Sequence, residues 1–421
     1  MMASPSMREL TAAFARIGCL SFGGPAGQIA LMHNEIVEQR GWVGEDEFLR
    51  ALNFCHLLPG PEAQQLATWI GWKLHGVRGG LIAGLLFVVP GAAVILALSL
   101  FYVAAAGLAW FAALFMGIKA AVIALVVQAL LRIGGRALGT RFKQAIALAA
   151  FVALAAFALP FPLVVLGAGA LGMIAAARHP QWLALKPVGG MADAAIPAAP
   201  LIGRTLATIA LGMAIWLIPL GALALALGSG HVLVTIGVFF AKLAVVTFGG
   251  AYAVLAYMAQ QAVDTHHWLT APEMADGLGL AETTPGPLIM VTQFVGFLGA
   301  YRSPAPFTPL VAGLAGAAVT TWMTFAPCFL WIFAAAPWLE RLEHARRLQG
   351  GLAAVTAAVV GVIASLALWF AVQTLYRPGS GIDWRAGVLT ALAFALLLRL
   401  KLAVPWVLAI CGLAGLALAQ I

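Results

Sequence analysis

The sequence predicts an all-α polytopic membrane protein made of two homologous halves, and three observations support this fold class. Of the 421 residues, 63% are hydrophobic and only 9% are charged, whereas a soluble domain carries roughly 25% charged residues. Apolar runs fill the whole chain, with a mean hydropathy of +1.00, which excludes a soluble domain on a single anchor. Distinctive residues recur at one fixed spacing, which indicates an internal repeat. The runs do not alternate at period two, so no β-barrel is expected.

About thirteen hydrophobic segments follow one another, and those interrupted by Gly or Pro could be re-entrant hairpins instead of crossings. A polar stretch with four prolines separates six of them from the other seven. We therefore expect a first transmembrane repeat (1–178), a polar linker (179–200), and a part (201–421) that holds an extra linking helix and the second repeat. The segments lie near residues 10–32, 50–74, 80–107, 110–131, 144–159, 161–177, 205–227, 232–260, 276–300, 308–336, 350–376, 386–399 and 402–420.

The repeat is carried by two motifs that recur with an offset of 226 residues, from Phe14 to Phe240. Its first motif is a cation followed by a Ser/Thr-Phe-Gly-Gly sequence, and its second motif is Pro-Gly-Pro. One offset across so many distinctive residues is not easily produced by chance. The matched pairs are Arg16 and Lys242, Ser21-Phe22-Gly23-Gly24 and Thr247-Phe248-Gly249-Gly250, Met32 and Met258, Glu38 and Asp264, Trp42 and Trp268, Glu47 and Glu273, and Pro59-Gly60-Pro61 and Pro285-Gly286-Pro287.

The second half is expected to be inverted relative to the first. If every segment crosses the membrane, the unpaired segment 205–227 makes the number of crossings between the two first helices odd. The positive-inside rule gives an independent check. With a cytoplasmic N-terminus, the excess of Lys and Arg falls in the inside loops, and the outside loops hold only Arg40, Arg50, Arg302, Arg377 and Arg385. Inverted repeats with broken helices are typical of secondary transporters, whose substrate binds near the membrane midplane.

The first motif places a cation five residues before a Gly-Gly break inside an apolar segment. Gly-Gly lets the backbone leave the helix, so that freed N–H groups and a helix N-terminus can face a ligand. A purely structural alternative is a tight helix crossing through small residues, with Arg16 and Lys242 extending to the interface. Because intramembrane cations are costly and occur here in both halves, we favour a functional role.

The second motif predicts a broken helix with unpaired backbone groups at membrane depth, because a helix cannot run smoothly through two prolines that flank a glycine. Polar residues gather around both copies. The alternative is a kink packed against a neighbour, with Glu62 and Glu282 capping helix N-termini. The residues expected at the broken helices, and as candidates for coupling, are His56, Pro59, Gly60, Pro61, Glu62, Gln65, Glu282, Thr284, Pro285, Gly286 and Pro287.

Other charged residues are expected to be less informative. Lys119 lies in the fourth segment, and its repeat partner is Leu352, so it stands outside the symmetric set. The acidic group Glu35, Glu38, Glu45, Asp46 and Glu47 and its counterpart Asp264, His266, His267, Glu273 and Asp276 are interpreted as solvated faces. No metal site and no cofactor are expected. Since no basic run interleaved with aromatic residues is present, nucleic-acid binding is not expected either.

These motifs resemble those of the chromate ion transporter family, in its long form with two fused repeats. The resemblance covers nearly the whole chain. It rests on Phe14–Pro25, the loop containing Trp42, Leu57–Gln65 with Trp69-Ile-Gly-Trp72, and the second-half copies, including Ala281–Pro287 and Phe294-Val-Gly-Phe297. It implies export of chromate across the bacterial-type inner membrane, with resistance to chromate as the result, and sulfate as the chemical look-alike. Strict symmetry fails at Arg16/Lys242, His56/Glu282 and Glu62/Leu288.

The residues suit a tetrahedral dianion. Arg16 and Lys242 would match its two charges, and backbone N–H groups at the breaks and two hydroxyls would donate to its oxygens. The expected substrate-binding residues are Arg16, Ser21, Phe22, Gly23, Gly24, Lys242, Thr247, Phe248, Gly249 and Gly250. The expected partners are a chromate or sulfate anion and the lipid bilayer, and a homodimer is considered.

Three alternatives differ in substrate or class. The first is export of chromate, which an inside-negative potential drives by about 2.3 kcal/mol per charge per 100 mV. The second is transport of sulfate or another oxyanion, whose import would need roughly three or more protons per cycle, with His56, Glu62 and Glu282 as candidates to carry them. The third is an intramembrane enzyme acting on lipid phosphates, which we disfavour because these three residues are tied to the symmetric breaks. A non-enzymatic transporter is therefore expected.

Overall fold

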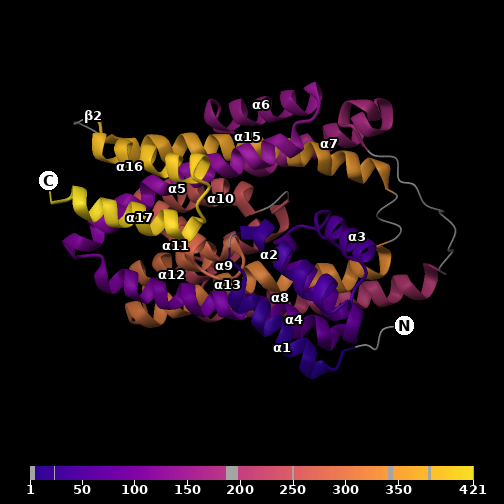
Figure 1. The fold of residues 1–421 in the computed structure, drawn as a ribbon. Helices are drawn as coiled ribbons and strands as arrows, with labels where there is room; N and C mark the ends of the chain where they lie inside the picture. The colour runs from indigo at the N-terminus through magenta and orange to yellow at the C-terminus, as the bar shows by residue number, and fades with distance from the viewer. Residues whose placement is uncertain are drawn as a thin grey trace.

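The computed structural model is an array of helices that run roughly side by side, with the two chain termini at opposite ends of the long helices (Figure 1). It describes residues 5–22, 24–185, 198–248, 251–339, 345–377 and 381–420. The predicted linker 179–200 is therefore described only at its ends, and Gly23, Gly249 and Gly250 lie outside the described residues. The only strands in these ranges are a two-residue antiparallel pair, Tyr376–Arg377 (β1) with Gly381–Ile382 (β2).

The helices of each part are listed here in chain order. Up to the linker they are α1 (Met7–Leu20), α2 (Gly24–His33), η1 (Asn34–Gln39), α3 (Glu45–Cys55), α4 (Glu62–Ala105), α5 (Ala109–Ala137), α6 (Arg141–Ala155), α7 (Phe161–Arg178) and η2 (Pro180–Leu183). After it they are α8 (Ala198–Leu227), α9 (Val232–Val246), α10 (Ala251–Gln260), η3 (Gln261–Thr265), α11 (Ala271–Thr283), η4 (Leu288–Met290), α12 (Val291–Arg302), α13 (Pro309–Ala335), η5 (Ala336–Trp338), α15 (Arg346–Leu375), α16 (Trp384–Phe394), η6 (Ala395–Arg399) and α17 (Val404–Leu418).

An all-α membrane protein is confirmed, but the expected number of spanning segments is not. Within the described ranges, six helices are long and apolar enough to cross a bilayer: Glu62–Ala105, Ala109–Ala137, Phe161–Arg178, Ile202–Leu227, Pro309–Trp338 and Arg346–Leu375. Three further apolar helices have 10–17 residues, which is shorter than the roughly 20 residues that a perpendicular helix needs.

Four of the predicted segments are each a pair of short helices. Segments 10–32 and 232–260 are α1 with α2 and α9 with α10, and their breaks begin at Ser21 and Thr247. Segments 50–74 and 276–300 contain α3 with the start of α4 and α11 with α12, interrupted at the Pro-Gly-Pro motifs. Helices of 10–15 residues rise only about 15–22 Å, which is less than the roughly 30 Å thickness of the hydrocarbon layer.

The helix that follows each Pro-Gly-Pro motif folds back on a long spanning helix. In the first half, α4 itself turns back at His75 and Gly76, where Gly76 has φ +60°. Its two arms touch at Gly71 and Gly79, where a Cβ added to either glycine would clash with the other's carbonyl oxygen. In the second half, α12 and α13 touch in the same way at Gly296 and Gly316. Close approach of two helices through glycine is common in membranes.

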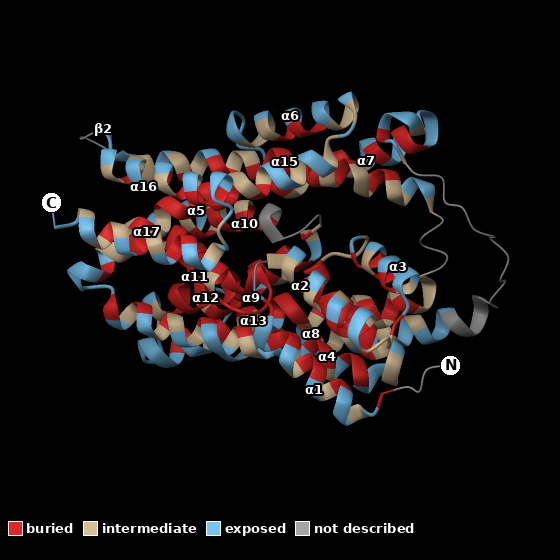
Figure 2. Cartoon of the chain, in the orientation of Figure 1, coloured by how far each residue is buried: buried red, intermediate tan, exposed pale blue. Residues whose placement is uncertain are grey.

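The apolar side chains divide between two main cores and the outer surface. One core joins α1, α3 and α4 around Phe14, Phe54 and Phe87, and the larger one joins α9 to α13 with α5 and α15. Figure 2 shows buried residues gathered along the middle of the helices and exposed ones on their outward faces. Leu166, Leu211 and many other large apolar side chains are exposed there, as expected where the surroundings are lipid instead of water.

Candidate functional site

Two hydrogen bonds join the broken helices of one half to those of the other. The N–H of Gly60 donates to the carbonyl oxygen of Thr247 over 2.8 Å, and the N–H of Gly286 donates to that of Ser21 over 2.9 Å. Each bond joins a Pro-Gly-Pro motif to a Ser/Thr-Phe-Gly-Gly motif, and the offset of 226 residues converts one bond into the other. We call them the Thr247–Gly60 junction and the Ser21–Gly286 junction. The two motifs therefore meet, and each takes its partner from the opposite half.

Each junction depends on a glycine between two prolines. Gly60 has φ +124° and Gly286 has φ +89°, a region that residues with a Cβ adopt only with strain. The flanking prolines cannot donate to a helix ladder, so α4 begins directly after Pro61 and η4 directly after Pro287. The motif thus leaves one N–H free for the other half.

Buried glutamine side chains satisfy the carbonyl oxygens that the second motif frees. Nε2 of Gln65 donates to the carbonyl of Pro59 over 2.7 Å, and Nε2 of Gln28 donates to that of Gly286 over 2.5 Å. Both glutamines are at most 1% exposed. An unpaired carbonyl at this depth would cost free energy. Sequence reasoning included Gln65 but missed Gln28, whose offset partner is Val254.

The hydroxyls of Ser21 and Thr247 are buried, and each donates to its own helix. The acceptors are the carbonyls of Ile17 and Leu243, both at 2.6 Å. A hydroxyl has one proton to donate, so either group must rotate away from its carbonyl before it can donate to a bound anion. In the conformation described here the hydroxyls close the ends of α1 and α9.

Several helices have their N-termini close to the junctions. The helices α2, α4, α10 and η4 begin within a few residues of a break. A helix N-terminus carries unpaired N–H groups and a partial positive charge, and such ends are ready-made sites for anions. An uncharged backbone arrangement of this kind is one way to stabilise a negative charge inside the apolar layer.

A spanning helix of each half closes the junction on the side of the other half. Gly91 of α4 packs on Pro285 and Gly286, where an added Cβ would lie 2.6 Å from the carbonyl oxygen of Pro285. The thiol of Cys328 in α13 lies against Gly60 in the same way. Each of these residues follows a proline inside its helix, Pro90 and Pro327. Sequence reasoning missed both prolines, although each falls in the third apolar segment of its half.

We compared the sequence with protein-family models and with known proteins. The family model described as "Chromate transporter" matches residues 8–173 and 234–416. The chain belongs to the chromate transporter family. The chromate transport protein of Cupriavidus metallidurans is 30% identical over 98% of this chain and 93% of its own length. That of Pseudomonas aeruginosa is 32% identical over 97% and 92%. These relatives are named as transport proteins, and the family is not one of enzymes. No solved structure matches the chain.

The two cations expected to bind substrate differ in their surroundings in this family member. Nη1 of Arg16 lies 3.3 Å from Oε1 of Glu35, and Nη2 of Arg40 lies 3.3 Å from the other oxygen of that carboxylate. Glu35 is only 2% exposed, so its assignment to a solvated face was wrong, because two arginines compensate its buried charge. Arg16 is itself 58% exposed. Lys242 is exposed on α9.

The polar residues beside the Pro-Gly-Pro motifs are mostly buried. Glu62 and Glu282 are 8% and 7% exposed, at the start of α4 and near the end of α11. Thr284 is also buried, and its hydroxyl donates to the carbonyl of Ala281 over 3.0 Å. His56, the offset partner of Glu282, is exposed at the end of α3. The two equivalent positions therefore have unequal surroundings.

Asp276 corrects a second expectation of a solvated face. It is only 4% exposed, and it accepts a hydrogen bond from the hydroxyl of Tyr102 over 2.8 Å. Lys119, which stood outside the symmetric set, lies on the other side of the same carboxylate. The prediction failed because both neighbours come from helices far away in the sequence.

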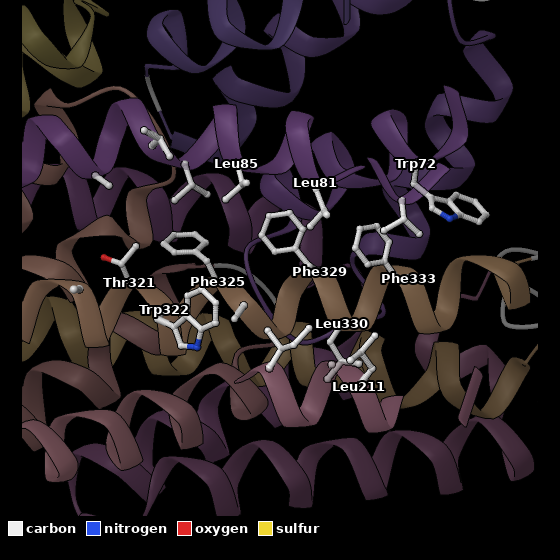
Figure 3. A pocket seen from close by; sticks show the side chains of 18 of the residues that line it. Trp72, Leu81, Leu85, Leu211, Thr321, Trp322, Phe325, Phe329, Leu330 and Phe333 are labelled. Atoms are coloured by element: carbon white, nitrogen blue, oxygen red, sulfur yellow. The ribbon is translucent and has the colours of Figure 1, made fainter. Parts of the chain in front are cut away.

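One large cavity of the described part has a mostly apolar lining. It is a groove of about 1120 Å³ between α4, α8 and α13. Figure 3 shows its wall of leucine, phenylalanine and tryptophan side chains, with Leu81 on α4, Phe329 on α13 and Leu211 on α8 among them. Arg204, Gln293 and Thr321 are among the few polar side chains of the lining, so most of the wall would offer a dianion no donor in exchange for its hydration. Within the described ranges, no group of three His, Cys, Asp or Glu side chains could hold a metal ion.

Proposed function

We propose that this protein exports chromate across the bacterial inner membrane by alternating access and thereby gives the cell resistance to chromate. Family membership supports the substrate class, since relatives that match over nearly their whole length are named chromate transport proteins. The observation that carries the mechanism is the pair of junctions, because broken helices that meet across two repeats are where secondary transporters bind substrate.

The two repeats, 1–178 and the part of 201–421 that follows the linking helix, are proposed to be inverted. An interface related by a two-fold axis has reciprocal contacts, in which residue i meets j and the equivalent of j meets the equivalent of i. The bonds from Gly60 to Thr247 and from Gly286 to Ser21 have this form. The Gly71–Gly79 and Gly296–Gly316 contacts repeat the same hairpin in each half.

The eight short helices are proposed to form four re-entrant hairpins. Helices α1 to the first arm of α4 would then enter and leave on the cytoplasmic side, where the N-terminus lies, and α9 to α12 would do so on the outer side. If the 15-residue helix α6 crosses together with α4, α5, α7 and α8, the number of crossings between the repeats stays odd. Arg40 and Arg50 then move to the inside, which agrees better with the positive-inside rule.

The proposed anion site lies at the junctions, with Arg16 and Lys242 as its cations. Chromate carries two negative charges, and the helix N-termini beside Ser21 and Thr247 supply partial positive charge and N–H donors. Arg16 would leave its ion pair with Glu35 when it binds the substrate, since a single guanidinium cannot pair fully with both anions. Phe22, Gly24 and Phe248 flank the breaks, and Gly23, Gly249 and Gly250 fall on residues outside the description.

Direction follows from charge. An inside-negative potential of 100 mV favours outward movement of a dianion by about 4.6 kcal/mol, so export is downhill when the concentrations are equal. Import of sulfate, which is also a tetrahedral dianion, would need coupled protons. That the transporter works as a homodimer stays a prediction, which cross-linking in membranes would test.

The proposal is tested by flux measurements with the purified protein in liposomes. Chromate efflux should be saturable, should increase with an inside-negative potential, and should be weakly inhibited by sulfate. Lys242→Ala should weaken chromate binding by roughly 30-fold, the equivalent of about 2 kcal/mol for one charge-assisted contact. Arg16→Ala should do the same, with Arg8→Ala as a control.

Two results would contradict this assignment. Preference for sulfate over chromate would favour the sulfate alternative, and normal export by both cation variants would remove the junctions as the anion site.

A further inference from the structure

Three polar side chains meet where α4, α5 and α11 pack together. The hydroxyl of Tyr102 donates to Oδ2 of Asp276 over 2.8 Å, and Nζ of Lys119 lies 3.6 Å from Oδ1 of the same carboxylate. Asp276 is 4% exposed, whereas the Lys119 side chain is 22% exposed. The cluster therefore consists of a buried acid, a phenol that holds one of its oxygens, and a cation that is partly exposed.

The cluster lies within the apolar layer. Lys119 is the eleventh residue of α5, which begins at Ala109, so it lies roughly 15 Å along the helix axis from that end. A charge at such a depth is expensive, and ionisable residues there commonly mark ion or proton pathways. A purely structural pair of this kind would gain little stability, because desolvation of both charges offsets their attraction.

The ion pair is loose on the side of the lysine. A separation of 3.6 Å is longer than the 2.7–2.9 Å of a good charge-assisted hydrogen bond. Oδ1 of Asp276 is buried and accepts no hydrogen bond from the described residues. One oxygen is thus fixed by Tyr102, while the other has an unused lone pair that can accept a proton.

The cluster occurs in only one half, unlike the junctions. The offset partner of Asp276 is Arg50, and Lys119 corresponds to Leu352 at the shifted spacing that pairs Gly117 with Gly350. Asp276 lies in α11, which leads directly into the Pro285-Gly286-Pro287 break. A change in its charge would therefore act on a helix that ends at the Ser21–Gly286 junction. A device present once per chain suits a step that occurs once per cycle.

Few other charged groups face this carboxylate. Glu273 lies one turn earlier on α11 and is paired with Arg302 of α12. Among the described residues, the groups that act on Asp276 are Lys119 from α5, Tyr102 from α4 and Glu273 from its own helix. The balance of charge at Asp276 is therefore set mainly by Lys119.

We propose that Asp276 is the coupling carboxylate of this transporter, and that it alternates between an ion pair with Lys119 and a protonated, neutral form. Protonation forms an O–H bond on Oδ1 with a proton taken from water, and release returns that proton to water, so no other reactant is needed. The neutral acid no longer attracts Lys119, and α11 is then free to move against α5. This inference rests on the proposed transport of chromate and adds to it one coupled proton per cycle.

The test is the steady-state distribution of radiolabelled chromate in liposomes at a fixed membrane potential. With one proton coupled to each chromate, a gradient of one pH unit should change the ratio of chromate inside to chromate outside the wild-type liposomes about tenfold. Asp276→Asn should remove the shift, and Lys119→Met should remove it too, because an unpaired buried acid stays protonated. Asp276→Glu should restore it, and Glu273→Gln, a nearby acid outside the cluster, should keep it.

Each result decides between the two proposals. Transport by the wild type without a shift, or a full shift in Asp276→Asn, overturns the coupling role and leaves chromate transport in place. Absence of chromate transport by the wild type overturns the proposed function itself. If Asp276→Asn does not insert into the membrane, Lys119→Met and a dye that reports proton uptake with chromate flux give the same decision.

Discussion

At the scale of single residues, two glycines decide whether the halves can meet. Gly60 and Gly286 have positive φ angles, and each donates its N–H to the other half. A side chain on Gly286 would bring its Cβ to 3.1 Å from the Cα of Gly91. Backbone strain and steric contact therefore act together at Gly286, and they do so at Gly60 too, where an added Cβ would lie 2.8 Å from Nε2 of Gln65.

Gly286→Ala is expected to destabilise the protein by about 1–3 kcal/mol, from left-handed backbone strain and the contact with Gly91. Thermal unfolding in detergent measures it. Gly24→Ala separates the causes, because φ is +70° there but nothing lies within 4 Å of an added Cβ. Gly387→Ala, also in open space and without a positive φ, should be neutral or slightly stabilising. Equal effects at all three positions would refute the argument.

Sequence reasoning found the break residues but not their neighbours. The repeat offset marked Ser21, Thr247, Gly60 and Gly286 because those residue types are rare together inside apolar segments. It gave no information on the pairing of Arg16 with Glu35, which comes from the geometry of two separate helices. The burial of Asp276 was missed for the same reason, since Tyr102 precedes it by 174 residues.

At the scale of elements, a proline inside a spanning helix frees a carbonyl oxygen that can accept a hydrogen bond from a neighbouring helix. A proline leaves the carbonyl four residues earlier without its helical donor. In α13, Pro327 frees the carbonyl of Met323, and the indole N–H of Trp216 in α8 donates to it over 3.2 Å. Trp216 is buried, whereas the other side chains described in α8 are exposed or half-buried. The linking helix is therefore held to the core partly through a proline of its neighbour.

Trp216→Phe is expected to cost about 1–3 kcal/mol, because the buried carbonyl of Met323 loses its donor. In a Pro327→Ala background the cost should be smaller, since the new N–H of residue 327 can bond to that carbonyl. A double-mutant cycle of thermal unfolding in detergent measures the coupling. Trp406→Phe is the control, as Trp406 is 67% exposed. Additive effects of the two substitutions would show that Trp216 does not depend on the proline.

Element type was easier to predict than element number. Apolar composition and Gly/Pro punctuation were sufficient to predict helices and the positions of their breaks. A hydropathy window cannot separate a helix that crosses from two short helices that turn back, because both are equally apolar. The sequence therefore left open whether the broken segments 10–32 and 276–300 cross the membrane or turn back.

At the scale of the whole molecule, the reciprocal junctions support two halves of opposite orientation. An inverted pair presents the same surfaces to opposite sides of the membrane, so a single site at their contact can be exposed to either side by a small relative movement. The excess of Lys and Arg in the loops expected to lie inside points the same way.

Gln39→Cys and Thr265→Cys test the inversion, since both residues are exposed and are related by the repeat offset. In a chain whose exposed Cys19 is replaced by serine, a membrane-impermeant maleimide should label residue 39 only in inside-out vesicles. It should label residue 265 only from the outer side. Labelling of both from one side would contradict the inversion, and a swap of the two sides would contradict the re-entrant hairpins.

The Thr247–Gly60 junction also constrains how the chain is made. The donor N–H belongs to residue 60, but its acceptor is the carbonyl of residue 247. The first half therefore enters the membrane before this N–H has its hydrogen-bond acceptor. At about 5–20 residues per second, roughly 10–40 seconds of synthesis pass before the partner exists. During that time water or the insertion machinery must occupy the open position. A ribosome that stops in the linker would leave an orphan first repeat, a natural target for membrane quality control.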